Sequence, residues 1–254
     1  MLVFALAGLF VGSFLNLCID RFPRGESILA LRSTCESCGE LLRVAALIPI
    51  FGSLFARGHG RSCARRLPVR HLAVEIGTAL FFALIWMRFP GSWQTMLIAF
   101  YGSLLIVFLA IDLERKTILD RVAYPAIAVA LLFALRIPER SVLEMLAGGL
   151  IAFSILAAIE LLIPSGKGMG VAKLAGFIGL AIGFPNIWVA LLLASVFGAL
   201  VYGTLILTKV IDRKDPIALG TVLAGGAIVT MLYGDLIMSW GAGGFEQIVA
   251  LLHL

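Results

Sequence analysis

Charged residues are scarce in this chain. They make up 14% of its 254 residues, and hydrophobic residues make up 61%, whereas a typical water-soluble domain has about 25% charged residues. Long apolar runs recur along the whole sequence, and a helix that spans a membrane needs about 20 such residues. The shortage of charge therefore excludes an ordinary soluble domain. It predicts an all-α, polytopic protein that is embedded in the lipid bilayer.

The apolar runs predict about eight transmembrane helices, of which the fourth and the sixth are short for a span. They are expected at residues 2–19, 72–87, 94–111, 122–135, 143–163, 171–184, 187–208 and 216–240. The chain then divides into three parts. These are a first transmembrane helix at 1–19, a small cytoplasmic loop domain that contains cysteines at 20–71, and a helical membrane core at 72–254.

The first apolar stretch begins at Met1 and lacks two marks of a removed signal peptide, a basic n-region and a small-residue cleavage site. We therefore interpret it as a retained span. With the N-terminus outside, 17 of the 20 basic residues fall in cytoplasmic loops, and Arg88, Arg136 and Arg140 fall outside. Basic residues prefer the cytoplasmic side, so the pattern predicts a multi-pass protein of the bacterial inner membrane. The net charge of +5 reflects this topology, and no nucleic-acid partner is expected.

Cysteine is also rare, with four residues in the chain. Cys35 and Cys38 form a CxxC turn followed by glycine, a geometry that places two thiolates on one tetrahedral zinc ion. Cys63 would be a third ligand, and His59 or His71 could supply the fourth. The expected cytoplasmic location disfavours structural disulfides. We therefore interpret the loop as a candidate zinc site with an incomplete ligand set, and the alternative is the remnant of a zinc knuckle that binds no metal.

Four stretches of sequence, together with the CxxC loop, resemble one known family in their order and spacing. They are VGSFLNLCIDRFPRGES at 11–27, AVEIGTALFFALIW at 73–86, AIDLERKTILDRV at 110–122 and GMGVAKLAGFIGLAIGFP at 168–185. Together they resemble the prepilin leader peptidases, the membrane aspartic proteases of type IV pilus and type II secretion systems. The resemblance covers most of the chain, up to about residue 210.

The resemblance implies a function. Such enzymes cleave the basic leader of type IV prepilins or pseudopilins at the cytoplasmic face of the membrane, and many methylate the new N-terminal amine with S-adenosylmethionine. For this chain it implies an aspartic endopeptidase with a prepilin or pseudopilin as substrate and S-adenosylmethionine as a candidate cofactor. Ser13 and Asn16 could help to hold the methyl donor, or they could form hydrogen bonds between helices.

The family's mechanism needs two aspartates. One carboxylate takes a proton from water while the other, kept protonated, donates to the scissile carbonyl. By resemblance, Asp112 is the first of the pair. The second belongs to a Gly-x-Gly-Asp motif with lysine two residues later, which Gly168, Gly170 and Lys173 match. Val171 stands in the position where aspartate is expected, so the chain is expected to be impaired or inactive.

Three interpretations of Val171 stay open. The chain is an engineered inactive variant, or a natural pseudoenzyme that binds prepilins without cutting them, or its second acid comes from elsewhere in the fold. No acidic residue occurs between Glu160 and Asp212, so a shift of the motif does not restore the match. Asp120 could contribute only if the chain bends after Asp112, because eight helical residues span about 12 Å along the axis.

Two other classes of function compete with the peptidase. A non-catalytic scaffold that binds prepilins would explain Val171 directly. A transporter would fit eight spans with a glycine-rich break near residues 166–170, but the strongest motifs lie on the expected cytoplasmic face. Prepilin cleavage with and without a restored acid separates the protease from the scaffold, and solute flux in liposomes tests the transporter.

Overall fold

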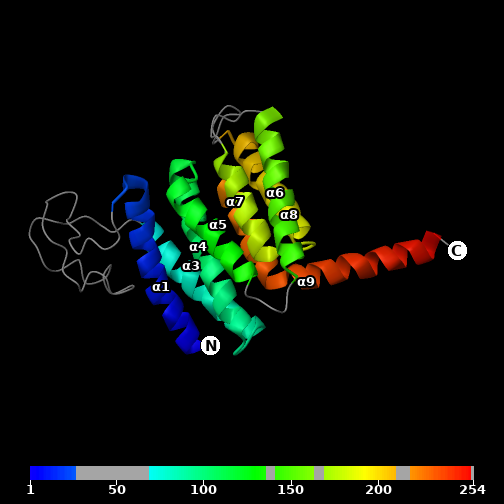
Figure 1. Cartoon of the computed structure of the whole chain (residues 1–254), viewed down its shortest axis with the longest axis horizontal. Helices are drawn as coiled ribbons and strands as arrows, with labels where there is room; N and C mark the ends of the chain where they lie inside the picture. The colour runs from blue at the N-terminus through cyan, green and yellow to red at the C-terminus, as the bar shows by residue number, and fades with distance from the viewer. Residues whose placement is uncertain (27–68, 136–140, 163–168, 210–217, 253–254) are drawn as a thin grey trace, which may run out of the picture. The chain divides into compact units, whose positions relative to one another are not determined.

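The computed structural model describes residues 1–26, 69–135, 141–162, 169–209 and 218–252, with side chains as far as Trp240. These residues form helices and turns, and no strand occurs among them. The all-α fold class is therefore confirmed (Figure 1). The α-helices are α1 Leu2–Arg21, α3 Val69–Arg88, α4 Trp93–Arg115, α5 Asp120–Ala134, α6 Val142–Leu162, α7 Gly170–Ile182, α8 Ile187–Leu207 and α9 Leu219–Leu252. A short 3-10 helix, η1, follows α1 at Phe22–Arg24.

Each expected span corresponds to one α-helix. Six of them, α1, α3, α4, α6, α8 and α9, are long and apolar enough to cross a membrane. The other two, α5 and α7, have 15 and 13 residues, which at 1.5 Å per residue is shorter than the roughly 30 Å of the hydrocarbon core. The last helix continues past its expected end at residue 240 to Leu252 (Figure 1).

The contacts between residues divide the chain into two compact units. Unit 1 is Met1–Ala110 and contains α1, α3 and most of α4. Unit 2 is Ile111–Leu254, which begins with the last residues of α4 and contains α5 to α9. Both units contain large side chains that are fully buried, among them Phe108 in unit 1 and Phe177 in unit 2.

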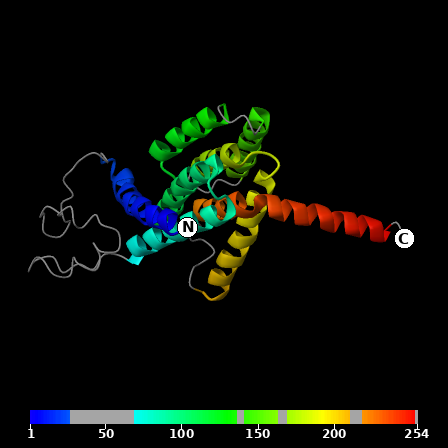
Figure 2. The ribbon, with the colours of Figure 1, turned by 90° about the horizontal axis from the view of Figure 1, so that it is seen from below.

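In unit 1, α1 packs closely along α3 (Figure 2). Two glycines of α1 make this approach possible. A Cβ atom on Gly8 would lie 2.8 Å from the Cα of Ala79, and one on Gly12 would lie 2.8 Å from the Cα of Glu75. Small residues one turn apart are typical of membrane helix pairs, because they let the two backbones come together. A larger side chain at either position would push the helices apart.

Polar side chains join one end of this helix pair. The Asn16 side-chain amide donates to the His71 carbonyl at 3.0 Å, and His71 Nε2 lies 3.1 Å from Asp20 Oδ2. Arg70 also forms an ion pair with Asp20. The C-terminal end of α1 is thus tied to the N-terminal end of α3, at the two points where the expected loop domain leaves and rejoins the helices.

In unit 2, α7 is the central helix. Its residues from Leu174 to Ile182 are all buried, and it packs against α5, α6 and α9. Its closest contact is with α6, where Gly179 meets the backbone of Gly148 and Gly149. Because α7 contacts neighbouring helices on several sides, other parts of the protein cover most of its surface.

Candidate active site

Asp112, the candidate first aspartate, lies near the end of α4, at the start of unit 2. It is 1% exposed, and α4 ends three residues later at Arg115. Lys116 then adopts a left-handed conformation with φ of 54°, and its N–H donates to the Asp112 carbonyl at 2.7 Å. This geometry closes the helix and turns the chain, and α5 begins at Asp120. Residues 112–120 are therefore not one continuous helix. The chain bends after Asp112, which is the condition under which Asp120 could contribute the second acid.

The carboxylate of Asp112 faces the first turn of α9. Its Oδ2 accepts the backbone N–H of Thr221 at 2.7 Å and the Thr221 hydroxyl at 3.2 Å. The first N–H groups of a helix lack partners within the helix and attract negative charge, and here the carboxylate from α4 satisfies one of them. Nothing in the sequence pointed to Thr221, because no local pattern relates two residues that lie 109 positions apart.

Ile118 lies between Gly170 and the start of α9. A Cβ atom on Gly170 would come within 3.1 Å of the Ile118 Cβ. A Cβ atom on Gly220 would lie 2.9 Å from the Ile118 Cδ1 and 3.0 Å from the Asp112 Cγ. The structure therefore brings Gly170 and Asp112 into one region of unit 2, on either side of one isoleucine. Gly168, the other glycine of the motif, lies outside the described residues.

Val171 stands in the first turn of α7, directly after Gly170. It is 8% exposed, and its neighbour Ala172 is 2% exposed. A valine side chain can neither give nor accept a proton, so this position makes only apolar contacts. The place where the resemblance implies a second carboxylate is thus apolar and buried in this chain.

Lys173, the last residue of the glycine motif, has an acidic partner. Its Nζ lies 2.6 Å from Asp120 Oδ1 and 4.7 Å from the centre of the Tyr124 ring. Asp120 and Tyr124 both belong to the beginning of α5. The ion pair therefore ties the first turn of α7 to the first turn of α5, and it engages Asp120 with a cation. The sequence contained both residues of this pair, but only the tertiary fold shows that they meet.

No group of three or more His, Cys, Asp or Glu side chains that could hold a metal ion occurs in the part of the chain that the structure describes. The expected zinc ligands Cys35, Cys38 and Cys63 all lie outside that part, so the zinc site stays a prediction. His71, one of the two candidates for the fourth ligand, is described, and its ring pairs with Asp20.

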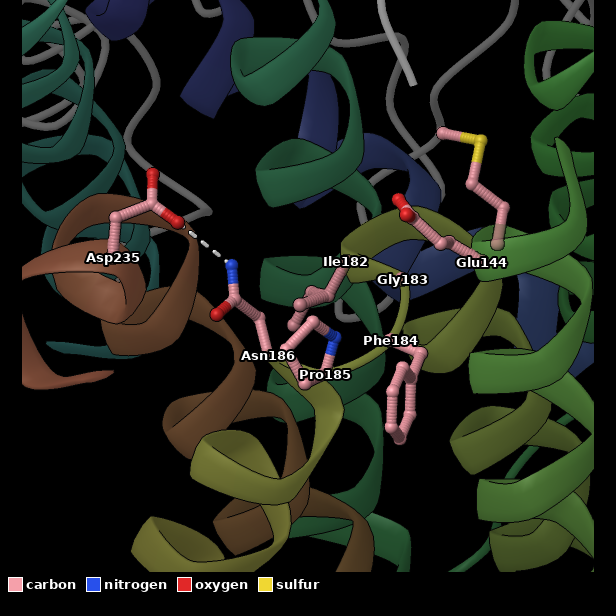
Figure 3. A pocket seen from close by; sticks show the side chains of 8 residues that line it. Glu144, Ile182, Gly183, Phe184, Pro185, Asn186 and Asp235 are labelled. Atoms are coloured by element: carbon pink, nitrogen blue, oxygen red, sulfur yellow. Dashed lines mark hydrogen bonds between the residues drawn. The ribbon is translucent and has the colours of Figure 1, made fainter. Parts of the chain in front are cut away.

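A polar cavity of about 290 Å³ lies at the C-terminal end of α7 (Figure 3). Its lining includes Glu144, Asn186 and Asp235, and the Asn186 side-chain amide donates to Asp235 Oδ1 at 2.8 Å. Since α7 has 13 residues, its two ends are about 20 Å apart. The cavity is therefore separate from the region around Asp112 and Gly170, which lies at the N-terminal end of the helix.

Two models of protein families match the chain. The bacterial peptidase A24 N-terminal domain matches residues 6–89. The type IV leader peptidase family matches residues 98–204, a range that includes Asp112, Val171 and Lys173. No solved structure matches the chain. The two matches together extend from the first helix into α8.

Several curated relatives, all called prepilin leader peptidase/N-methyltransferase, align with most of the chain. The protein of Bacillus subtilis (strain 168) is 33% identical over 236 residues, which cover 92% of this chain and 94% of the relative. That of Aeromonas hydrophila is 30% identical over 264 residues, which cover 92% and 91%. That of Pseudomonas putida is 26% identical over 255 residues, which cover 90% and 88%. The similarity therefore extends over nearly the full length of both proteins in each comparison.

Proposed function

Because this chain belongs to the type IV leader peptidase family, we propose that unit 2 holds the site of a membrane aspartic endopeptidase for prepilins or pseudopilins. One observation carries the proposal. The buried carboxylate of Asp112 lies in the same region as Gly170, where the glycine motif begins α7. An ionisable group that is buried in a membrane protein is costly, and such groups mark functional sites.

In this proposal Asp112 acts as the base. Its carboxylate takes a proton from a water molecule, and the water oxygen forms a bond to the scissile carbonyl carbon. A second carboxyl group, which is protonated, gives its proton to the carbonyl oxygen. As the carbon–nitrogen bond breaks, Asp112 returns its proton to the leaving amine, and the second group recovers the proton that it gave. Two carboxyl groups in different protonation states can divide the work in this way.

Val171 stands where that second carboxyl group would be. We propose that the chain with its present sequence binds a prepilin and cleaves it poorly or not at all. The burial of Val171 supports this proposal, because an apolar side chain fills the position. A non-catalytic scaffold that binds prepilins is the second candidate function, and the same observation favours it.

The proposed site faces the cytoplasm. Asp112 is followed by Arg115 and Lys116, and basic residues at the ends of spans favour the cytoplasmic side. The apolar N-terminal helix of a prepilin would enter laterally from the bilayer and lie among the spans. Its basic leader would then reach Asp112 without passing through the hydrocarbon core. This arrangement predicts that residues beside Asp112 contact the substrate.

Photocrosslinking tests substrate binding without requiring cleavage. A photoreactive amino acid at Leu113, which is 59% exposed and adjacent to Asp112, is expected to crosslink a prepilin in lipid vesicles. Leu143 is the matched control, because it is 77% exposed and adjoins Glu144 at the other end of α7. Unlabelled prepilin should compete at Leu113. Equal crosslinking at the two positions, or none at Leu113, would count against the proposed site.

We also propose S-adenosylmethionine as a methyl donor, in line with the names of the relatives. The buried Asn16 Oδ1 in unit 1 accepts no hydrogen bond from a described residue, and such an acceptor fits the amino or hydroxyl groups of that molecule. Asn16 would hold the donor, which supplies an electrophilic methyl group for the new N-terminal amine. Asn16→Ala is expected to weaken equilibrium binding of radiolabelled S-adenosylmethionine about tenfold, because one hydrogen bond is lost. Unchanged binding would remove Asn16 from the site.

A further inference from the structure

The start of α9 supplies the hydrogen-bond donors that hold Asp112. The N–H and the hydroxyl of Thr221 both donate to the same carboxylate oxygen, Oδ2, at 2.7 and 3.2 Å. Two donors on one oxygen hold that oxygen of the carboxylate against the first turn of α9. Neither of these Thr221 donors bonds to the other oxygen, Oδ1. In the proposed reaction, Oδ1 is therefore the oxygen that takes a proton from water.

Gly220 provides the space that this contact needs. A Cβ atom at this position would lie 3.0 Å from both the Cγ and the Oδ2 of Asp112, and 2.9 Å from the Ile118 Cδ1. Real Cβ atoms very rarely come that close to other heavy atoms. Any larger residue would therefore displace the carboxylate, the isoleucine or the first turn of α9. Glycine therefore lets Asp112 come against the backbone of this turn without a shift of either side chain.

A tyrosine of α8 holds the residue that precedes α9. The Tyr202 hydroxyl accepts the Ala218 N–H at 2.8 Å and lies 3.3 Å from the Ala218 carbonyl, to which it donates. Ala218 is buried and comes two residues before Gly220. Both backbone groups of one residue are thus engaged by one side chain, which limits the movement of the turn that bonds to Asp112.

We propose that Gly220 and Thr221 form a carboxylate cradle that holds Asp112 in the position from which it acts. Thr221 is a positioning residue that works through Asp112, and Gly220 leaves the space that the Asp112 carboxylate occupies. The inference rests on the proposed function of Asp112. It goes further by assigning a role in the reaction to residues of α9, which begins beyond the end of the peptidase-family match at residue 204.

Two pairs of variants on α9 test the carboxylate cradle, each with a control on the same helix. Gly220→Ala adds a methyl group against Asp112, whereas Gly225→Ala adds one where no heavy atom lies within 4 Å. Thr221→Val removes a hydroxyl that donates to Asp112, whereas Thr230→Val removes a buried hydroxyl that donates within its own helix at 2.8 Å. Differences within each pair therefore report on Asp112 and not on the helix in general.

Chemical labelling shows whether Asp112 is held in place. The full chain in lipid vesicles is treated with a water-soluble carbodiimide and an amine, and modification of Asp112 is measured by mass spectrometry. Gly220→Ala and Thr221→Val are expected to label about tenfold faster than the unmodified chain, the factor that loss of one hydrogen bond to a charged group typically gives. The two control variants and Thr221→Ser, which keeps the hydroxyl, should label at the unmodified rate. Equal rates in all five variants would overturn the proposal.

Kinetics in a Val171→Asp background separate positioning from folding. Thr221→Val is expected to lower kcat for prepilin cleavage about tenfold with KM unchanged, and Thr221→Ser is expected to restore it. An unchanged kcat in Thr221→Val would show that the carboxylate cradle has no part in catalysis. The labelling rates could change as expected while Val171→Asp cleaves no prepilin. That result would support the carboxylate cradle and contradict the proposed peptidase function.

Discussion

Val171→Asp is expected to turn this chain into an active prepilin peptidase. The substitution places a carboxyl group in the first turn of α7, in the region that also contains Asp112. We expect the rate of leader release from a prepilin in lipid vesicles to rise by roughly 10²–10⁴-fold, the range that a positioned general acid contributes. Gel mobility or mass spectrometry of the released leader measures this rate.

Two further variants show whether the new activity uses a pair of carboxyl groups. Adding Asp112→Asn to Val171→Asp should return the rate to that of the unmodified chain, since asparagine keeps the size of aspartate but cannot act as a base. Ala172→Asp is the matched control, because it adds a carboxyl group at the next buried position of the same turn. Cleavage by Ala172→Asp as fast as by Val171→Asp would contradict the assignment of position 171.

The unmodified chain belongs in the same experiment. Robust cleavage without any substitution would mean that another acid completes the pair, and Asp120→Asn would then test the acid that pairs with Lys173. No cleavage by Val171→Asp, together with specific crosslinking at Leu113, would favour the scaffold over the protease. The three outcomes therefore separate a silenced protease, an active protease with a different acid and a prepilin-binding scaffold.

Gly179→Ala is expected to cause a large loss of stability. A Cβ atom at this position would lie 2.2 Å from the Gly148 carbonyl oxygen and 2.7 Å from the Gly149 Cα. These are backbone atoms of α6 that cannot rotate away, so α6 and α7 would have to separate. Overpacking of this kind typically costs about 1–3 kcal/mol. At about 2–4 °C for each kcal/mol in a protein of this size, Tm should fall by roughly 2–12 °C.

A glycine in an open position provides the control. Gly203 in α8 has no heavy atom within 4 Å of its ideal Cβ position, and alanine is more favourable than glycine within a helix. Gly203→Ala is therefore expected to leave Tm unchanged or to raise it slightly. Scanning fluorimetry of the purified proteins in detergent measures both variants. Equal melting of Gly179→Ala and Gly203→Ala would contradict the close approach of α6 and α7.

The helices could be predicted from the sequence because the membrane leaves few alternatives. In lipid every backbone N–H and C=O must be satisfied within the segment, so a long apolar run has to be helical. Even the short runs expected at 122–135 and 171–184 correspond closely to α5 and α7. The end of α9 was less predictable. A pattern of hydrophobicity shows where a span is needed, but it does not show where a helix stops.

The sequence by itself determined the class of the protein, its helices, its resemblance to the peptidase family and the valine at position 171. Only the tertiary structure decided that Lys173 pairs with Asp120, 53 positions away, and that Thr221 bonds to Asp112, 109 positions away. The physical reason is the distance along the chain over which each kind of interaction acts. Hydrophobicity and backbone hydrogen bonding are satisfied within one helix, whereas these contacts depend on how closely the helices pack. In unit 2 that closeness depends on glycines whose neighbours cannot be read from the sequence.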